Sequence, residues 1–435
     1  MNTTHKDTAI IDFQKEYFPC AKEWWCVEGF FQTLEDNKHW SLKTDFYQAI
    51  TRRHPQESYH SITLFDLDEN KHYFYNKENS QSKLTTKPNE MFLQFDKSSL
   101  CGSDTNYELF SSDPDHRIDL SLKCTATSNP YWVAHNITDG WLPWSLGSYR
   151  YGYIPQSAIN GTMDIAGKHY TIQGQGYIEH VWGDFAFFFE GKHRKSLKKI
   201  VSIYARLLDW WIHNHAVVIP KTVSLTTDNR PPGYDWCWAT LDNGWSVFFG
   251  NAVFWIDDGP ATGILILTKD GDDYVEFDKI RFHYRRRKYI EKYDIFYPLD
   301  LEILATRKDE QLSLQLQSTA ESVETIFDFE EKKKIFGLMI NQIPGAVTGH
   351  YHSNEGTIKV RGRAKLEVHR VFNRFGHNSL QLKLDLSKNH LALLSQLDSH
   401  YFAKNIDVHI QLLPTPGFKI HCARSLPPHQ SDAER

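Results

Sequence analysis

The segment from Gly174 to Asp184 carries the densest group of side chains that could act on a ligand. Successive side chains of a strand point to opposite sides, so Tyr177 and Glu179 share one face and His180 and Trp182 share the other. If the first pair faces the interior of a β-barrel, a carboxyl group lies beside a phenol in apolar surroundings. Burial raises the pKa of a carboxyl group, which lets it donate a proton near neutral pH.

A structural role is the alternative for the same segment. Glu179 could cap turns at one end of a barrel, and His180 could pair with a neighbouring backbone carbonyl. For a catalytic role we take Glu179 as the candidate general acid, with Tyr177 and His180 as the accompanying catalytic candidates.

Three tyrosines alternate along a second segment, so Tyr149, Tyr151 and Tyr153 share one face of a strand. Such phenols can orient a ligand oxygen or stabilise a carbocation through their ring faces. They can equally be a packing ladder between strands. For a bound ligand, the candidate contacts are these tyrosines and three tryptophans, Trp182, Trp25 and Trp236.

Most of the chain that must position these residues consists of short alternating segments separated by turn residues. Trp40–Tyr47 and Gly161–Ile165 are two examples, and Asp36-Asn37 is one of the turn signals. Many strands at this spacing predict an all-β protein built from antiparallel β-barrels.

One segment, Arg194 to His213, has apolar residues at helical spacing and predicts a basic amphipathic helix. A lid, a membrane-surface contact and simple packing between the barrels stay open as its role. On this helix we expect Lys195, Lys198 and Lys199 to face solvent or anionic lipid. We expect the opposite face to contact protein or bilayer through Leu197, Val201, Tyr204 and Leu208.

An internal repeat indicates two tandem domains. Glu23–Cys26 is echoed by Asp235–Trp238, and Gly174–Glu179 is echoed by Gly362–Glu367, in the same order. We therefore predict an N-terminal barrel with the proposed site over 1–190, a helix and linker over 191–232, a C-terminal barrel over 233–425, and a polar tail over 426–435.

Composition narrows the function classes. The 435 residues carry a net charge of −5, so no basic field favours nucleic acid. Aromatic residues make up 14%, which favours strands and sites for flat or polyene ligands. The sequence has no C-x-x-C pair and no nucleotide-binding or serine-hydrolase motif, and its H-x-H pairs lack a third ligand, so metal and nucleotide cofactors are disfavoured.

Scattered cysteines, a polar N-terminus and the lack of an apolar run of about 18 residues lead us to expect a cytoplasmic protein. The basic helix leaves peripheral membrane association open.

These motifs, in this order, resemble the carotenoid 1,2-hydratase (hydroxyneurosporene synthase) superfamily and related tandem lipocalin-like proteins. The resemblance rests on an opening E-W-W segment, a tyrosine-rich strand, a G-x-[WY]-x-D-x-x-[WR]-G-like motif, and later W-D-W and Y-x-E-G-like motifs. They correspond to Glu23–Cys26, Tyr149–Tyr153, Gly174–Gly183, Tyr234–Gly244 and Tyr351–Gly356. Two departures are Glu179, where the family has aspartate, and the helix at 194–213.

The resemblance implies two lipocalin-like barrels and hydration of an isoprenoid double bond, or cyclisation of a terpenoid, with the acid at position 179. It also implies that no metal or nucleotide is needed. Within such a fold, a tryptophan near the first strand, such as Trp25, commonly plugs the closed end of the barrel. The alternative function is a non-catalytic carrier of a hydrophobic small molecule.

Overall fold

The computed structural model describes most of the chain. The described residues are 13–50, 57–79, 84–87, 90–103, 105–144, 147–185, 197–214, 222–225, 233–256, 259–271, 273–293, 295–318, 323–327, 336–373, 378–387, 390–399 and 404–424.

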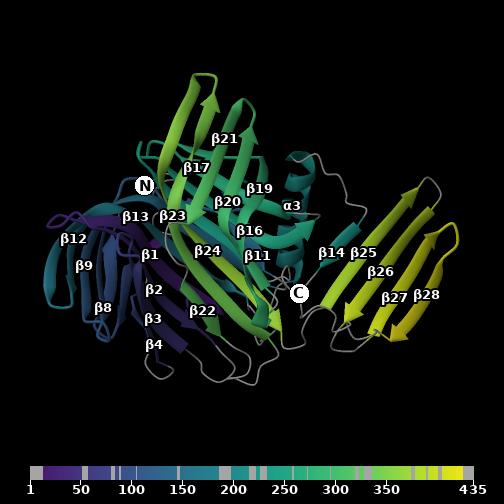
Figure 1. The fold of residues 1–435 in the computed structure, drawn as a ribbon, viewed down its shortest axis with the longest axis horizontal. Coiled ribbons are helices and arrows are strands. Elements are labelled where there is room, and N and C mark those ends of the chain that lie inside the picture. The colour runs from purple at the N-terminus through teal and green to yellow at the C-terminus, as the bar shows by residue number, and fades with distance from the viewer. Residues whose placement is uncertain are drawn as a thin grey trace, which may run out of the picture.

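The first half of the chain forms a curled antiparallel sheet of thirteen strands (Figure 1). Its main path runs β4-β3-β2-β1-β13-β12-β9-β8-β7-β6-β5, with β10 and β11 paired to β12. The strands are β1 (Lys22–Thr33), β2 (His39–Ala49), β3 (Glu57–Asp66), β4 (Lys71–Asn79), β5 (Thr85–Thr86), β6 (Met91–Phe95), β7 (Ser98–Ser103), β8 (Asn106–Asp113), β9 (Ile118–Ala126), β10 (Tyr131–Trp132), β11 (Trp141–Trp144), β12 (Gly147–Ile165) and β13 (Lys168–Asp184).

The second half forms a ten-stranded antiparallel sheet with the path β18-β17-β16-β15-β24-β23-β21-β20-β19, with β22 paired to β23. The strands are β15 (Tyr234–Leu241), β16 (Ser246–Ile256), β17 (Gly259–Thr268), β18 (Tyr274–Glu276), β19 (Lys279–Ile290), β20 (Ile295–Arg307), β21 (Glu310–Ser318), β22 (Val323–Phe327), β23 (Phe336–Ser353) and β24 (Gly356–Asn373). A short 3-10 helix, η2 (Glu291–Tyr293), joins β19 to β20.

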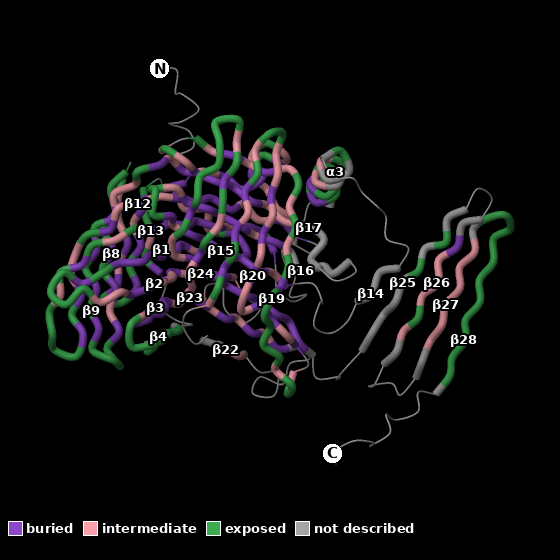
Figure 2. Tube along the Cα trace, turned by 45° about the horizontal axis from the view of Figure 1, so that its top comes forward, coloured by how far each residue is buried: buried purple, intermediate pink, exposed green. Residues whose placement is uncertain are grey.

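A third, five-stranded sheet stands apart from the two large ones in both the ribbon and the tube view (Figures 1 and 2). It has the order β14-β25-β26-β27-β28. These strands are β14 (Thr222–Leu225), β25 (Asn378–Ser387), β26 (His390–Ser399), β27 (Lys404–Leu413) and β28 (Gly417–Arg424). The sequence-based domain limits stay a prediction. The strands from Asn378 onward, assigned there to the second barrel, pair with one another and with β14.

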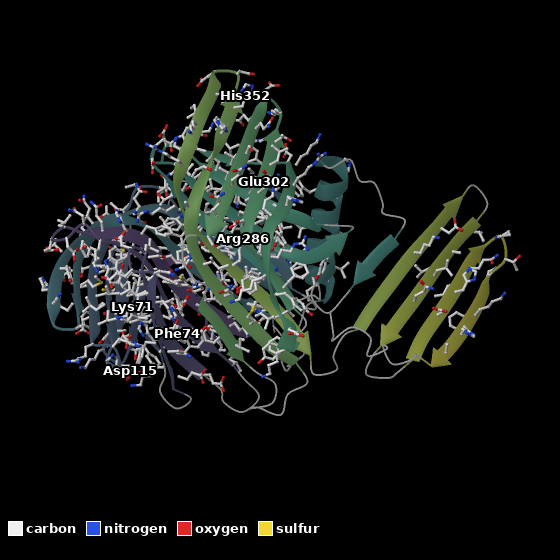
Figure 3. The ribbon with its side chains drawn as sticks, in the orientation of Figure 1. Lys71, Phe74, Asp115, Arg286, Glu302 and His352 are labelled. Carbon is white, nitrogen blue, oxygen red and sulfur yellow. The ribbon has the colours of Figure 1, made fainter. Side chains whose placement is uncertain are left out.

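Each large sheet encloses an apolar core, and a third apolar cluster lies between the two sheets. The first core includes Trp25, Leu42 and Ile178, and the second includes Phe249, Leu301 and Leu366. Strand β1 is buried on both faces because alternate residues enter the first core and the cluster between the sheets. Figure 3 shows charged side chains on the outside, among them Lys71 on the first sheet and Arg286 on the second.

This architecture confirms the predicted fold class, an all-β protein of two antiparallel units. The repeat also recurs in space: β1 pairs with β13 and β2, and β15 pairs with β24 and β16. None of the described helices has the length and apolar character needed to cross a membrane.

The predicted amphipathic helix is present as α3 (Leu197–Asn214), next to the short α2 (His135–Thr138) and β11. Its buried face differs from the expected one. Ile200 and Ile203 are buried, whereas Val201 and Tyr204 are 64% and 45% exposed. The apolar stripe is wide enough to offer two faces, and the one on Ile200 packs against the protein. Membrane contact stays a prediction.

Two lysines of α3 have side chains that the structure describes. Lys198 and Lys199 are both exposed, as expected. The ammonium group of Lys199 also lies 3.0 Å from the centre of the Trp141 ring. This cation–π contact ties the first turn of α3 to β11. The side chains of Lys195, Leu197 and Leu208 lie outside the described residues.

Candidate functional site between the two sheets

Glu179 lies on β13, between its neighbours β1 and β12. In the register of these strands, Cys26 and Tyr153 are directly opposite Glu179. Alternation along each strand places Trp24 and Tyr151 one row away on the same face of the sheet. Three strands therefore bring aromatic side chains around one carboxyl group.

Three hydrogen-bond donors converge on the carboxyl group of Glu179. The indole N–H of Trp24 donates to Oε1 at 2.6 Å, and the hydroxyl of Tyr177 donates to Oε2 at 2.9 Å. The hydroxyl of Tyr151 also donates to Oε2 and lies 2.8 Å from the hydroxyl of Tyr177. The carboxyl group and the two phenols thus form one connected network.

Burial raises the pKa of Glu179 to about 7, against the opposing effect of the nearby Lys43 and of the hydrogen bonds from Tyr151 and Trp24. The same burial, with the adjacent Glu179 carboxylate, raises the pKa of Tyr151 and Tyr177 well above the usual value for a phenol. At neutral pH the two phenols are therefore protonated, while Glu179 is about half protonated.

Glu179 faces the second half of the chain. Trp236 on β15 packs edge-on against Tyr177, with ring centres 5.5 Å apart, and Phe248 on β16 stacks on Tyr153 at 4.7 Å. All four rings belong to the cluster between the sheets. This position differs from the expected one in the interior of the first barrel. Alternation groups residues by face, but only the packing of the second sheet decides which face is covered.

The opposite face of β13 points into the first core. His180 is fully buried there; its Nε2 lies 2.9 Å from Glu23 Oε1 and its Nδ1 lies 2.6 Å from the carbonyl oxygen of Phe13. Trp25 stacks on the His180 ring at 4.8 Å. Trp182 stacks on Tyr17 at 3.8 Å. The structure thus separates these three residues from Glu179 by the thickness of the sheet.

The three predicted tyrosines line the covered face of β12. Tyr151 and Tyr153 are buried between the sheets, and Tyr149 is half-buried with its ring 5.2 Å from that of Phe185. The hydroxyl oxygen of Tyr153 and the indole nitrogen of Trp236 have no hydrogen-bond partner among the described residues. These two polar atoms lie in the same cluster as the network around Glu179.

A buried ionic cluster adjoins the aromatic one. Lys43 Nζ on β2 lies 3.5 Å from Glu28 Oε1 on β1 and contacts Glu367 Oε2 on β24. Lys365 Nζ lies 3.5 Å from the other oxygen of the same carboxyl group, Glu28 Oε2. Burial alone would lower the pKa of Lys43, but Asp45, Glu367 and Glu28 raise it well above the usual value. Within this cluster, Lys43 favours the ionised form of Glu179 and Glu28 opposes it.

Sequence reasoning missed Trp24, Lys43 and Glu367 as residues of this region. The repeat contained a signal for two of them, because Trp24 aligns with Trp236 and Glu367 aligns with Glu179. Lys43 gave no signal, since Glu28 and Glu367 lie 15 or more residues away in sequence and come from both sheets, although a third partner, Asp45, is two residues away.

Chemically, Glu179 with the hydroxyls of Tyr151 and Tyr177 can donate one proton and take it back in apolar surroundings. Among the described residues, no group of three or more His, Cys, Asp or Glu side chains is arranged to hold a metal ion.

Comparison with known proteins identifies the fold. A protein designated AttH from Nitrosomonas europaea superposes with a TM-score of 0.56 at 16% identity, over 84% of this chain and 95% of that one. Kievitone hydratase from Nectria haematococca superposes with a TM-score of 0.52 at 12% identity, over 81% of this chain and 89% of that one. No protein-family model and no curated protein matches the sequence.

The chain therefore has the fold of these tandem lipocalin-like proteins, as the resemblance found in the sequence implied.

Proposed function

We propose that the protein is a cofactor-independent hydratase or cyclase that protonates a double bond of a hydrophobic, isoprenoid-like substrate. Glu179 is the general acid in this proposal. The observation that carries it is the buried carboxyl group of Glu179, which combines a pKa of about 7 with hydrogen bonds from Trp24, Tyr151 and Tyr177. A general acid works best when its pKa is close to the working pH.

The reaction begins when neutral Glu179 transfers its proton to one carbon of the alkene, and the π electrons form the new C–H bond. The other carbon becomes a tertiary carbocation, which the faces of Tyr151 and Phe248 stabilise. In a hydratase, water adds to the cation and returns a proton to the Glu179 carboxylate, so the net change is addition of one water. In a cyclase, an internal alkene or hydroxyl group captures the cation instead, and the cyclised cation then loses a proton to the Glu179 carboxylate, so the net change is an isomerisation.

The interface aromatics support a hydrophobic ligand. The cluster between the sheets contains Tyr153, Tyr177, Trp236, Trp238 and Phe248, all buried. The hydroxyl of Tyr153 and the indole N–H of Trp236, which have no partner among the described residues, could each bind a polar atom of a ligand or a water molecule.

The second candidate function is a non-catalytic carrier. The same aromatic cluster, with the Tyr153 hydroxyl and the Trp236 indole N–H, favours it equally, because binding needs no acid. The two functions differ in what the protein does to its ligand, not in where the ligand lies.

Isotope incorporation tests the proposal and does not require the product to be known. Purified protein is incubated in D₂O with a panel of isoprenoid alcohols and polyenes, and the products are analysed by mass spectrometry. We expect deuterium at a former alkene carbon for at least one compound, with wild type and with the control Asp164→Asn, which removes an exposed carboxyl group of β12. Glu179→Gln should abolish incorporation.

A binding measurement with the same compounds distinguishes an enzyme from a carrier. Quenching of tryptophan fluorescence by the same compounds should be alike for wild type and Glu179→Gln. Binding without incorporation by the wild type across the panel would favour the carrier. Full incorporation by Glu179→Gln would refute the role of Glu179.

A further inference from the structure

The small sheet of β14 and β25–β28 has one apolar and one mainly polar face. On β26, β27 and β28, the register forms three rows of residues on the same face. These rows are Leu393, Ile410 and Phe418; Ser395, Val408 and Ile420; and Leu397, Ile406 and Cys422. Eight of the nine positions are apolar if cysteine is counted with the apolar residues, and none is charged.

The other face of the same strands is different in kind. Its corresponding rows are Leu394, His409 and Lys419, followed by Gln396, Asp407 and His421. A face of mixed polar and charged residues is what a solvated sheet face requires. The sheet is therefore amphipathic, with its apolar side fixed by the period-two pattern of three consecutive strands.

In the single chain the apolar side is exposed along β28 and partly exposed along β26 and β27. Phe418 and Ile420 are 62% and 56% exposed. Figures 1 and 2 both draw the sheet as a single layer apart from the large sheets, and β14 is the strand that lies beside one of them, at β16. An antiparallel sheet with an apolar face is stable only when a second layer covers that face.

We propose that this layer is the same sheet of a second copy of the chain, packed face to face about a two-fold axis. Four strands of eight to ten residues and the four-residue β14, about 4.8 Å apart, present roughly 700 Å² of surface. Two such faces bury roughly 1,400 Å², within the usual range for a specific interface. A two-fold axis needs one self-complementary patch, and a flat grid of aliphatic and aromatic side chains can interdigitate with its own copy, as in a β-sandwich.

A lipid surface fits the sheet less well. Strands β14 and β28 are the two edges of the sheet, so the outward N–H and C=O groups of their backbones have no ladder partner among the described strands. Hydrocarbon cannot hydrogen-bond these groups, whereas a sandwich leaves both edges in water. The nine positions of the three rows also include no lysine or arginine that would bind anionic headgroups.

The oligomeric state of the full-length chain tests the proposal. Light scattering and sedimentation velocity over about 0.1–50 µM should show a dimer, as expected for an interface of this size. Ile420→Lys should raise the dissociation constant at least about a hundredfold, because each dimer would bury two lysines. His421→Lys is the matched control, since it adds the same residue one position away on the polar face, and it should leave the dimer intact.

Folding of the variants is checked by circular dichroism at concentrations where each is monomeric. Phe418→Ser provides a second, milder disruption of the same face and should weaken the dimer in the same direction. A wild-type monomer across the whole range would overturn the proposal, as would a dimer unaffected by both substitutions. A monomer that co-sediments with phosphatidylglycerol vesicles, and loses that binding in Ile420→Lys, would assign the face to lipid instead.

Discussion

Trp24 and Glu179 meet across neighbouring strands, where the indole N–H donates to Glu179 Oε1 at 2.6 Å. An indole nitrogen can donate but not accept. Oε1 must therefore act as the acceptor in this contact, and the acidic proton of neutral Glu179 belongs on Oε2. Oε2 contacts the hydroxyls of Tyr151 and Tyr177, which can accept as well as donate. In the neutral form, Oε2–H therefore donates to one of the two phenol oxygens, which then accepts instead of donating to Glu179.

The protonation of Glu179 should be visible in the infrared spectrum. Its pKa of about 7 predicts a protonated-carboxyl band at about pH 5 that disappears with a midpoint near pH 7. Any step that uses Glu179 as an acid should then slow about tenfold per pH unit above about pH 7. A wild-type-minus-Glu179→Gln difference titration measures the midpoint. A midpoint near 4.5, the ordinary value, would show that burial does not control this group.

The raised pKa of Glu179 also makes the free energy of unfolding depend on pH. Because folding raises the pKa of Glu179 from 4.5 to about 7, the native state holds the proton more tightly than the unfolded chain. The stabilising effect of this proton is full below pH 4.5 and is lost as pH rises through 7, a change of about 3 kcal/mol. Glu179→Gln carries no such proton, so its stability relative to wild type should increase from about pH 5 to about pH 8. Urea unfolding of both proteins at the two pH values tests this, and a constant difference would contradict it.

Removing one phenol should move the pKa of Glu179 upward. The hydrogen bond from Tyr151 favours the ionised carboxylate, so Tyr151→Phe should raise the midpoint of the infrared titration. Tyr153→Phe is the matched control, since the hydroxyl of Tyr153 has no hydrogen-bond partner among the described residues. It should leave the midpoint unchanged. Equal shifts in the two variants would point to a general change in packing.

The stability of the second half of the chain should depend on a buried ion pair. Arg370 donates to Asp235 Oδ1 at 2.8 Å, and both side chains are almost fully buried. Asp235→Asn leaves the guanidinium group without a counter-charge and should cost about 3–5 kcal/mol of unfolding free energy. Asp300→Asn breaks the partly exposed pair with Arg286 and should cost at most about 1 kcal/mol. Denaturant unfolding compares the two, and similar losses would argue against a special role for the buried pair.

The sequence alone determined the strands, their two faces and the duplication. Period-two alternation depends only on neighbouring residues, so the grouping of Tyr177 with Glu179, and of His180 with Trp182, could be predicted from the segment itself. The helix at 197–214 was likewise predictable, because a stripe at helical spacing is a local property. The echo of Glu23–Cys26 in Asp235–Trp238 was enough to indicate two similar units.

Only the tertiary structure decided which face carries the candidate site. A strand pattern is the same whether Glu179 points into a barrel or away from it, and the second sheet settles this by covering the outer face with Trp236 and Phe248. The contacts of Lys43 with Glu28 and Glu367 likewise depend on how two distant segments approach. Burial of a charge depends on everything packed around it, so the raised pKa of Glu179 could not follow from its neighbours in sequence.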